Sequence, residues 1–417
     1  MSAHKNAKVE FTSSVNLDRL TSLPEGLKCN ILSRLNVQEA VRTSILSSAW
    51  RNAWTTMPEI LLCDCTFAKS KFITLVDMVL SLHKGPLFTF TISGKERYHD
   101  VFDRWMLRLS MNLPSYVTIE LTTGPKYKIP SSLFSIGLEH LYLKNCIISL
   151  PRVFQGFDFL TVLDLDVFST TDKNINNLVS CCPMLSMLRL CSFEGIKCLN
   201  IQARKLECLE VNGMFEDIHL DAPNLKEADV TLLKCESYQS VAVDRGKSYM
   251  KQALDNLRYI ETLSLNGYIL TYLSKGCIHS KLSAVFDHLE SIWLEICFWD
   301  PREVLTAGSL FHNAPMLKVL ELRSFPWNEK FGPVSTWDQD QASIEELTLQ
   351  MDHLVTVIVT DFLGLGCEVS FIGKLLSWAP VLEEVKIEGK RKIDEIMVLK
   401  KLLALPRVSQ KAKVVVA

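Results

Sequence analysis

The sequence predicts an α/β protein with a short helical module at the N-terminus and a long, curved solenoid built from a parallel sheet and outer helices. The first observation is a ten-residue stretch, NAPMLKVLEL at 313–322, which returns in altered form at 181, 221 and 378. In each copy, proline marks the end of the preceding element, and apolar residues two apart predict a strand with one buried side. The second observation is that residues 18–59 show helical periods instead.

A search for the pattern L-x-x-L-x-L, with conservative replacements, places the strands along the chain. Matches begin at residues 138, 160, 185, 206 and 225, and the pattern resumes at 260, 289, 317, 354 and 382. The first five follow one another at steps of 22, 25, 21 and 19 residues, which is the period of leucine-rich repeats. Another match, IEELTL at 344, lies too close to the next one, so we expect the strand at 354.

The stretches between these strands favour helices. NINNLVSCC and PREVLTAGSLFHN carry apolar residues at spacings of three and four, which predicts right-handed helical crossovers between parallel strands. Residues 63–125 alternate helical and strand patterns in the same way, so we expect them to form the first, atypical coils.

Large apolar residues or cysteines stand three places beyond most strands, where regular leucine-rich repeats favour asparagine or cysteine. They are Cys146, Phe168, Phe193, Met214, Tyr268, Cys297 and Phe325. We therefore expect coils that are held together by apolar packing rather than by a polar ladder.

The strand residues between the buried positions are predicted to face outward on the concave side of the solenoid. They are His140, Tyr142 and Lys144, then Val162, Asp164 and Asp166, then Met187, Arg189 and Cys191, then Ser291, Trp293 and Glu295, and then Val319, Glu321 and Arg323. The core must repeat, whereas this face is free to vary, so a specific partner protein can be recognised here. Aromatic and arginine residues are the best anchors, which selects Tyr142, Arg189, Trp293 and Arg323 as target-binding residues. The alternative is an ordinary solvated strand face.

The N-terminal module is predicted to contain two amphipathic helices. Ser22 and Glu25 have the spacing of a capping box, with Pro24 in the first turn, and a stripe of Leu27, Ile31, Leu32 and Leu35 follows. A second helix is expected to start near Glu39, with Val41, Ile45 and Ala49 four residues apart, and Leu46 and Trp50 on a neighbouring stripe. Because the module is short, it carries more apolar surface than it can bury within itself. Part of this apolar surface should therefore contact another protein. The alternative is that all of it packs on the solenoid.

The same residues carry a resemblance to a known family. LPEGLKCNILSRL followed by EAVRTSILSSAWRNAW resembles an F-box, in the form found in plant F-box proteins that also contain leucine-rich repeats and a C-terminal FBD domain. Five further segments resemble that family in the same order, over roughly residues 16–416: LHKGP, DRWMLRLS, YKIPSSLF, CFWDPREVL, and WAPVLEEVKI with LKKLLALPRVSQKAKVVV. The chain differs from most relatives at Ser48-Ala49, where a basic residue is usual, and at Asn36-Val37, where the usual turn contains proline.

The resemblance implies both a domain organisation and a role. It divides the chain into a disordered tail (1–15), an F-box (16–62), a leucine-rich-repeat solenoid (63–340) and an FBD domain that continues the solenoid (341–417). F-box proteins are non-catalytic substrate receptors of SCF-type ubiquitin ligases, in which the F-box docks on a Skp-type adaptor bound to a cullin and the repeats hold the target. Carried over by position, the adaptor-binding and F-box core residues are Leu23, Pro24, Leu27, Ile31, Leu32, Val41, Leu46 and Trp50. The alternative is a leucine-rich-repeat interaction scaffold without a ligase role.

Composition and motifs argue against other classes of function. The formal charge of −2 provides no basic field for nucleic acid, and the apolar run at 354–365 is short and broken by Asp361, which argues against a membrane span. The thirteen cysteines lack the spacing of a zinc site and are expected to be reduced thiols in the nucleus or cytoplasm. RGKS at 245–248 and GLG at 364–366 lack the spacing of phosphate-binding loops, so no cofactor is expected.

Overall fold

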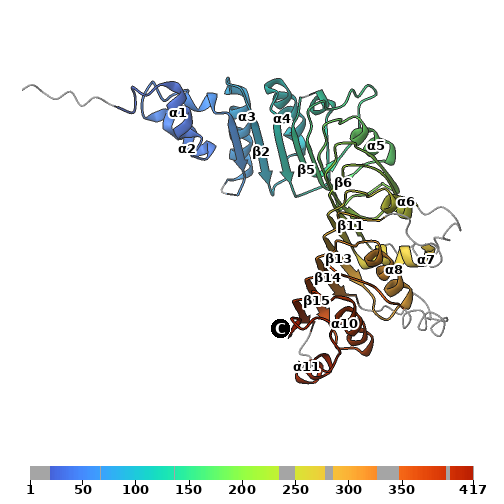
Figure 1. Cartoon of the computed structure of the whole chain (residues 1–417). Helices are drawn as coiled ribbons and strands as arrows, with labels where there is room; N and C mark the ends of the chain where they lie inside the picture. The colour runs from blue at the N-terminus through green and yellow to red at the C-terminus, as the bar shows by residue number, and fades with distance from the viewer. Residues whose placement is uncertain are drawn as a thin grey trace, which may run out of the picture.

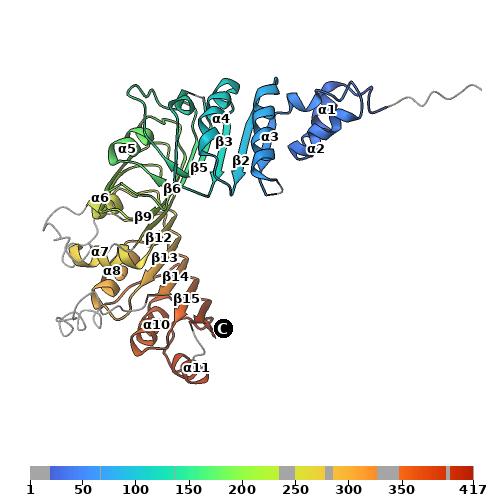
Figure 2. The same ribbon diagram turned by 180° about the vertical axis from the view of Figure 1, so that it is seen from behind.

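The computed structural model describes residues 19–65, 67–135, 137–233, 249–277, 285–325, 347–390 and 395–416. Within these ranges the chain forms an arch that begins with the small helical module and continues as one long stack of coils, as Figures 1 and 2 show. The tail predicted for residues 1–15 and the RGKS segment lie outside the described residues.

A single parallel sheet runs through the whole arch and lines its inner side (Figure 1). Almost every strand pairs with the next long strand in the sequence, so the described chain forms one continuous solenoid. The strands, in their order across the sheet, are β1 (Glu59–Cys63), β2 (Thr89–Gly94), β3 (Tyr116–Leu121), β5 (His140–Ile147), β6 (Val162–Ser169), β7 (Met187–Cys191), β9 (Cys208–Gly213), β11 (Glu227–Leu232), β12 (Thr262–Leu265), β13 (Ser291–Ile296), β14 (Val319–Ser324), β15 (Thr356–Phe362), β16 (Glu384–Gly389) and β17 (Lys413–Val416), and β4 (Tyr127–Lys128) pairs with β5 alone.

Every strand predicted from the repeat pattern is present, including the one at 354, whereas residues 347–349, the described part of the competing match, form no strand. The predicted first coils are present too, and β1 starts four residues before the boundary expected at residue 63. The last three strands continue the same sheet, and Gly364, with a φ of 78°, lies in the turn between β15 and the following helix.

Helices cover the outer side of the arch in most coils (Figure 2). They are α3 (Lys69–Leu82), α4 (His99–Asn112), the 3-10 helix η3 (Ser131–Ser135), α5 (Asp172–Ser180), α6 (Tyr249–Asp255), α7 (Gly267–Cys277), α8 (Pro301–His312), α10 (Gly366–Trp378) and α11 (Glu395–Leu403). The general expectation of helical crossovers is wrong in the coil between β5 and β6, where residues 148–161 form neither helix nor strand. It is also wrong in the two coils where β8 (Cys198–Gln202) and β10 (Asp217–Asp221) pair as a separate two-stranded sheet. These coils are the shortest, and an extended outer segment with alternating apolar residues closes them in fewer residues than a helix would.

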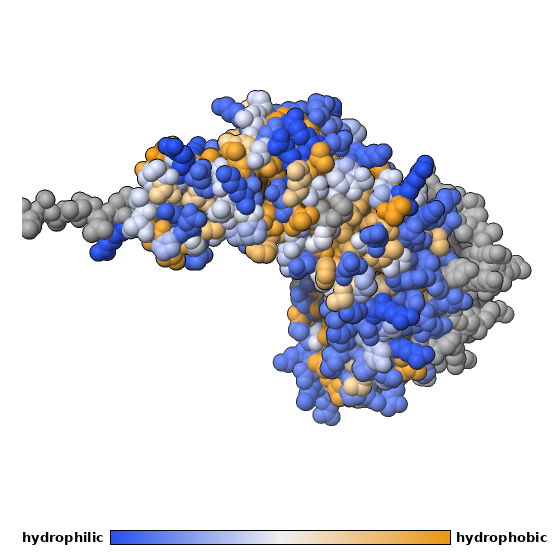
Figure 3. Space-filling model, turned by 90° about the horizontal axis from the view of Figure 1, so that it is seen from above, coloured by the Kyte–Doolittle hydropathy of each residue, from blue (hydrophilic) through white to orange (hydrophobic). Residues whose placement is uncertain are grey.

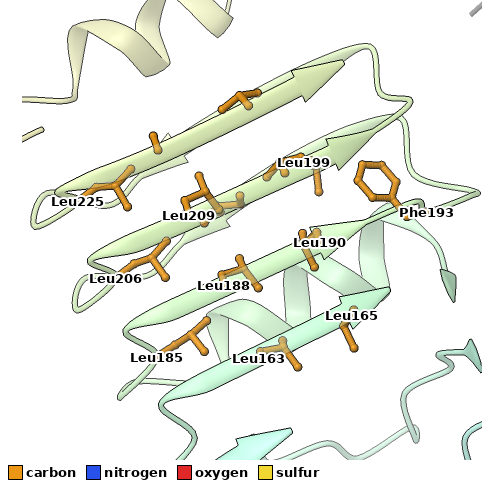
Figure 4. Packing of buried hydrophobic residues seen from close by; sticks show 14 of the residues in the cluster. Leu163, Leu165, Leu185, Leu188, Leu190, Phe193, Leu199, Leu206, Leu209 and Leu225 are labelled. Atoms are coloured by element: carbon orange, nitrogen blue, oxygen red, sulfur yellow. The ribbon is translucent and has the colours of Figure 1, made fainter. Parts of the chain in front are cut away.

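The core is a ladder of leucines that repeats from coil to coil. Figure 4 shows leucines of β6, β7 and β9, together with the leucines just before β7, β9 and β11, stacked in rows between the sheet and the outer segments. Leu163, Leu188 and Leu209 align by strand register, and each is fully or almost fully buried. Each coil can bury its apolar side only against its neighbours, so the stability of every coil depends on the coils beside it.

The apolar residues beyond the strands do join neighbouring coils, as predicted. The rings of Phe168 and Phe193 lie 5.7 Å apart, and those of Phe193 and Phe215 lie 6.3 Å apart. Met214 was expected in this position, but it is exposed and its neighbour Phe215 is buried in its place. The aromatic stack therefore continues with Phe215, one residue after the predicted position.

Apolar packing, which the sequence predicts in place of a polar ladder, is not all that joins the coils, because buried polar side chains also contact the preceding coil. Asn145 donates from Nδ2 to the carbonyl of Leu121 at 2.9 Å. Asn266 both donates to the carbonyl of Leu232 at 2.8 Å and accepts from its backbone N–H at 3.0 Å. Both asparagines are buried, and each satisfies backbone groups of the preceding coil that the strand ladder leaves without partners.

Two buried glutamates stabilise the later coils in the same manner. Glu303, in the first turn of α8, accepts from the backbone N–H of Cys297 at 2.9 Å and contacts Thr271 Oγ1 of the preceding coil at 2.6 Å. Burial raises the pKa of the Glu303 carboxyl to about 7. Glu368 of α10 accepts in its turn from Ser324 Oγ at 2.6 Å and from Leu365 N–H at 2.8 Å.

Candidate functional site

The N-terminal module begins with α1 (Glu25–Leu32), which starts where the sequence predicts but without the predicted cap. The Ser22 hydroxyl donates to the carbonyl of Arg19 at 3.1 Å, and Pro24 is the residue that precedes the helix. The expected Ser22–Glu25 capping box is therefore wrong. The capping box of this module belongs to α2 (Val37–Arg42), where Asn36 Oδ1 accepts from Glu39 N–H at 2.9 Å. The asparagine that replaces the usual proline thus starts the second helix.

The second helix is earlier and shorter than the sequence indicates. It starts at Val37 instead of near Glu39, ends at Arg42, and continues as short 3-10 turns, η1 (Thr43–Ile45) and η2 (Ala53–Thr56). The Thr43 hydroxyl donates to the carbonyl of Ala40 at 2.7 Å, a local bond that competes with continuation of the helix. Ile45 and Leu46 therefore lie beyond the end of α2 and not on its predicted apolar stripes.

Two of the predicted adaptor-binding residues lie inside the module. Leu32 and Trp50 are buried, and the ammonium group of Lys28 lies 5.9 Å from the centre of the Trp50 ring. Lys28 also donates to the carbonyl of Ala49 at 3.5 Å, which ties α1 to the turn before η2. Leu32 and Trp50 therefore hold the fold of the module, and Leu23 and Val41 are partly buried against the same core.

The remaining predicted residues are exposed and form what we name the N-terminal apolar surface. Ile45 is 87% exposed, and Leu46 is 65% exposed. A 3.3 Å hydrogen bond between Thr21 and Ser47 brings the segment before α1 next to the segment after η1. Figure 3 shows apolar residues, in orange, among polar ones on this module. The surface consists of Leu20, Pro24, Leu27, Ile31, Ile45 and Leu46, of which Leu20 and Ile45 are additions to the predicted set.

Backbone contacts fix the module rigidly to the first coil of the solenoid. Thr55 accepts from the backbone N–H groups of Lys84 and Gly85 at 2.8 and 3.2 Å, and buried His83 contacts the Met57 carbonyl through Nε2 at 2.8 Å. A Cβ on Gly85 would lie 2.9 Å from the Thr56 Cα, so only glycine permits this approach. The N-terminal apolar surface therefore has a set orientation relative to the concave face.

The concave face shows the predicted strand register. Burial alternates along the strands, and the residues between the buried leucines face the inside of the arch. Three predicted target-binding residues, Tyr142, Arg189 and Trp293, fall in one row across the sheet. This central concave row contains Thr118, Tyr142, Asp164, Arg189, Glu210, Asp229, Ser264, Trp293 and Glu321.

The predicted arginines already form ion pairs within the chain. Arg189 lies 2.9 Å from Glu210 and 3.4 Å from Asp164, on the strands to either side. Arg323 of the adjacent row likewise lies 2.8 Å from Asp361 and 3.6 Å from Glu295. Both guanidinium groups therefore have carboxylate partners on two neighbouring strands. Of the four predicted target-binding residues, only Tyr142 and Trp293 remain available to a partner.

Sequence reasoning missed two acidic residues in the central concave row, Glu210 and Asp229. Both stand at the outward positions of repeat matches, LECLEV at 206 and LKEADV at 225, so the pattern contained the signal. Asp229 is exposed, and neighbouring strands that displace part of its water raise the pKa of its carboxyl above the ordinary value. The predicted arginines alone would indicate a positively charged face, whereas these acids make the face more negative.

Comparison with known proteins identifies the two domains that carry the N-terminal apolar surface and the concave face. Residues 20–61 match the model of the F-box domain, and residues 79–411 match the model "At1g61320/AtMIF1, LRR domain". The chain is 31% identical to F-box/FBD/LRR-repeat protein At1g13570 of Arabidopsis thaliana, over 95% of this chain and 97% of that protein. The chain belongs to the F-box/FBD/LRR-repeat proteins. Two further relatives from the same plant are F-box/FBD/LRR-repeat protein At4g00160, 28% identical over 82% of this chain and 79% of its own length, and F-box/FBD/LRR-repeat protein At5g56420, 27% identical over 77% and 81%.

The F-box match places the N-terminal apolar surface entirely within the F-box. The repeat model extends from α3 into the segment expected to be the FBD domain, in agreement with the single continuous sheet of this F-box/LRR protein. Within the described ranges, no group of three or more histidine, cysteine or acidic residues is arranged to hold a metal ion. Across those same ranges, no helix is both long and apolar enough to span a membrane.

Proposed function

We propose that this protein is the substrate-recognition subunit of an SCF-type cullin–RING ubiquitin ligase. In this role the F-box binds a Skp-type adaptor, which connects it to a cullin, and the concave face of the repeats binds the target. An F-box together with repeats is the domain composition of such receptors, and the relatives carry both in their names. The receptor itself contributes binding and geometry, while catalysis belongs to other subunits.

The observation that carries this proposal is the N-terminal apolar surface. Its six side chains stay exposed although the module has its own core of Leu32, Trp50 and Trp54. An exposed apolar patch on a folded module marks a protein contact, and burial of its leucines and isoleucines would contribute about 1.5–3 kcal/mol for each side chain. The residues that pack on the solenoid are different ones, which answers the alternative of a purely internal role.

The rigid junction supports the second half of the proposal. Because the carbonyl groups of Thr55 and Met57 are held by hydrogen bonds to the first coil, a target on the concave face keeps a defined position relative to the adaptor. A receptor that presents lysines of its target to a distant catalytic subunit benefits from such a fixed arrangement.

The test replaces two exposed residues, Leu27→Ser with Ile45→Ser, and measures co-purification of a Skp-type adaptor with the full chain. We expect loss of the adaptor with little change in thermal unfolding, because both side chains are solvent-exposed. The matched control is Leu107→Ser with Met111→Ser on α4, two residues that are 58% and 78% exposed outside the F-box. If the F-box variant retains the adaptor as well as the control does, the ligase role is refuted and the interaction scaffold becomes the better description.

A further inference from the structure

The concave face between β6 and β14 carries more negative than positive charge, and the excess has a definite arrangement. Among the described residues, three cations each bridge two carboxylates on flanking strands. Lys144 lies 3.1 Å from Asp166 and 3.6 Å from Glu120. Arg189 and Arg323 are bridged in the same way by the acid pairs described above. Counted with the flanking strands β3, β5 and β15, these three cations contact six acids, and Lys390 lies 3.8 Å from one of them, Asp361. Acids therefore still outnumber cations on the described face before any unpaired acid is counted.

Two further acids in the central concave row have no cation among the described residues within ion-pair distance. Asp229 receives hydrogen bonds only from neutral hydroxyl groups, including that of Thr231 at 3.3 Å. Glu321, on β14, is half-buried and forms no ion pair with a described residue. The unpaired charge is thus concentrated in the later part of the row, between β11 and β14.

An aromatic residue stands between these two acids. Trp293 pairs in register with Ser264 on one side and with Glu321 on the other, and Ser264 pairs with Asp229. At about 4.8 Å for each strand step, Trp293 is roughly 5 Å from the Glu321 position and roughly 10 Å from the Asp229 position along the sheet. An indole ring with carboxylates on both sides attracts an organic cation, through its face and through charge.

Buried polar oxygens beneath this face add to its negative potential. Asp164 Oδ1 and Asn212 Oδ1 are buried oxygens that accept no hydrogen bond from the described residues. Asn212 pairs in register with Cys191 on one side and Thr231 on the other, one row from the unpaired acid. Loss of solvent raises the pKa of both Asp164 and Asp229, so each carboxylate lacks part of the stabilisation that water would give it. Lysine and arginine side chains are donors only and carry the missing positive charge.

We propose that the concave face from β6 to β14 binds a lysine- or arginine-bearing segment of the target protein, with Asp229, Glu321 and Trp293 holding one cationic side chain. This inference rests on the proposed function and specifies its substrate class by charge complementarity. An anionic segment would meet the excess carboxylates and be repelled, since like charges brought together at an interface cost several kcal/mol.

The experiment measures binding of two fluorescent synthetic peptides to the full chain, one of alternating lysine and serine and one of alternating glutamate and serine. We expect only the lysine peptide to bind, with affinity that falls as salt is added. Asp229→Asn and Trp293→Ala should each weaken its binding by about tenfold, in the range that charge pairs and cation–π contacts provide. The matched controls are Asp103→Asn on α4 and Trp299→Ala after β13, which remove an exposed acid and an exposed indole elsewhere.

Each outcome decides between site-specific binding and general charge attraction. Equal weakening by Asp103→Asn and Asp229→Asn, unchanged binding by Asp229→Asn, or equal binding of the glutamate peptide would overturn the inference. Adaptor co-purification is scored in parallel for the concave-face variants. If the Leu27→Ser/Ile45→Ser variant loses the adaptor but still binds the lysine peptide, the two surfaces act independently. Failure of the inference and failure of the ligase role therefore remain distinguishable.

Discussion

Replacing Glu303 by glutamine should make the stability of the solenoid less dependent on pH. Glu303 is 3% exposed, and its carboxyl group joins α8 to the end of β13 and to α7. The Thr271 hydroxyl has one hydrogen but two acceptors within reach, Glu303 Oε1 at 2.6 Å and the Gly267 carbonyl at 2.8 Å. A glutamine amide can donate to this hydroxyl and still accept from the Cys297 N–H, so the substitution preserves both contacts.

The sign of the effect follows from the direction of the pKa change. Burial raises the pKa of this carboxyl from the ordinary value of 4.5 to about 7, so the folded state binds the proton more tightly than the unfolded state does. Its contribution to stability is therefore fully present below the unfolded pKa and is lost as the pH rises through the folded pKa. Each pKa unit is worth about 1.4 kcal/mol, so the loss is about 3 kcal/mol when the group is fully ionised.

The assay is urea unfolding of the wild type and of Glu303→Gln at about pH 5 and about pH 8. We expect the variant to gain about 2–3 kcal/mol relative to the wild type between these two conditions, because glutamine stays neutral. Glu216→Gln, at an exposed ion pair with Lys197, serves as the control and should change little. An equal difference between variant and wild type at both pH values would show that Glu303 titrates normally and that burial does not hold its proton.

Three further predictions test the fold at single positions. Leu320→Ala should lower the free energy of unfolding by about 2–5 kcal/mol because Leu320 is fully buried, while Glu321→Ala should change it by no more than about 0.5 kcal/mol; equal effects in thermal or urea unfolding would mean that the strand register is wrong by one residue. Glu368→Gln, in contrast to Glu303→Gln, should destabilise the protein by about 1–3 kcal/mol in the same assay, since one amide oxygen cannot accept the bonds that two carboxylate oxygens now receive, and a stable variant would refute this account. Gly85→Ala should cost about 1–3 kcal/mol through its clash with the Thr56 backbone and should increase protease cleavage at the F-box junction, whereas an uncleaved and equally stable variant would show that the junction adapts.

The repeat pattern was sufficient for the strands but not for the segments between them. Alternating apolar residues place Leu320 inside and Glu321 outside without further information, because side chains alternate along every strand. The outer segments obey no such rule. Whether 198–202 forms a helix or a strand depends on how much chain is available to close a coil against its neighbours, which no local propensity records.

The candidate surfaces show a similar division. The sequence identified the apolar residues of the F-box as a set, but it could not tell the buried Trp50 from the exposed Leu46, because that depends on where α2 ends and the chain turns. In the same way it identified Arg189 as an outward residue without indicating that Glu210 and Asp164 neutralise it from adjacent strands.

The sequence by itself determined the solenoid, its register and the family, since these follow from local periodicity and from motifs that are contiguous in the chain. Only the tertiary structure decided which side chains remain available for partners. Residues 19 or more positions apart, such as Glu210 and Asp229, become neighbours on adjacent strands, and their charge is set by what lies beside them in the sheet. Exposure and electrostatic pairing depend on the summed surroundings of a residue, and those surroundings come into being only when the coils stack.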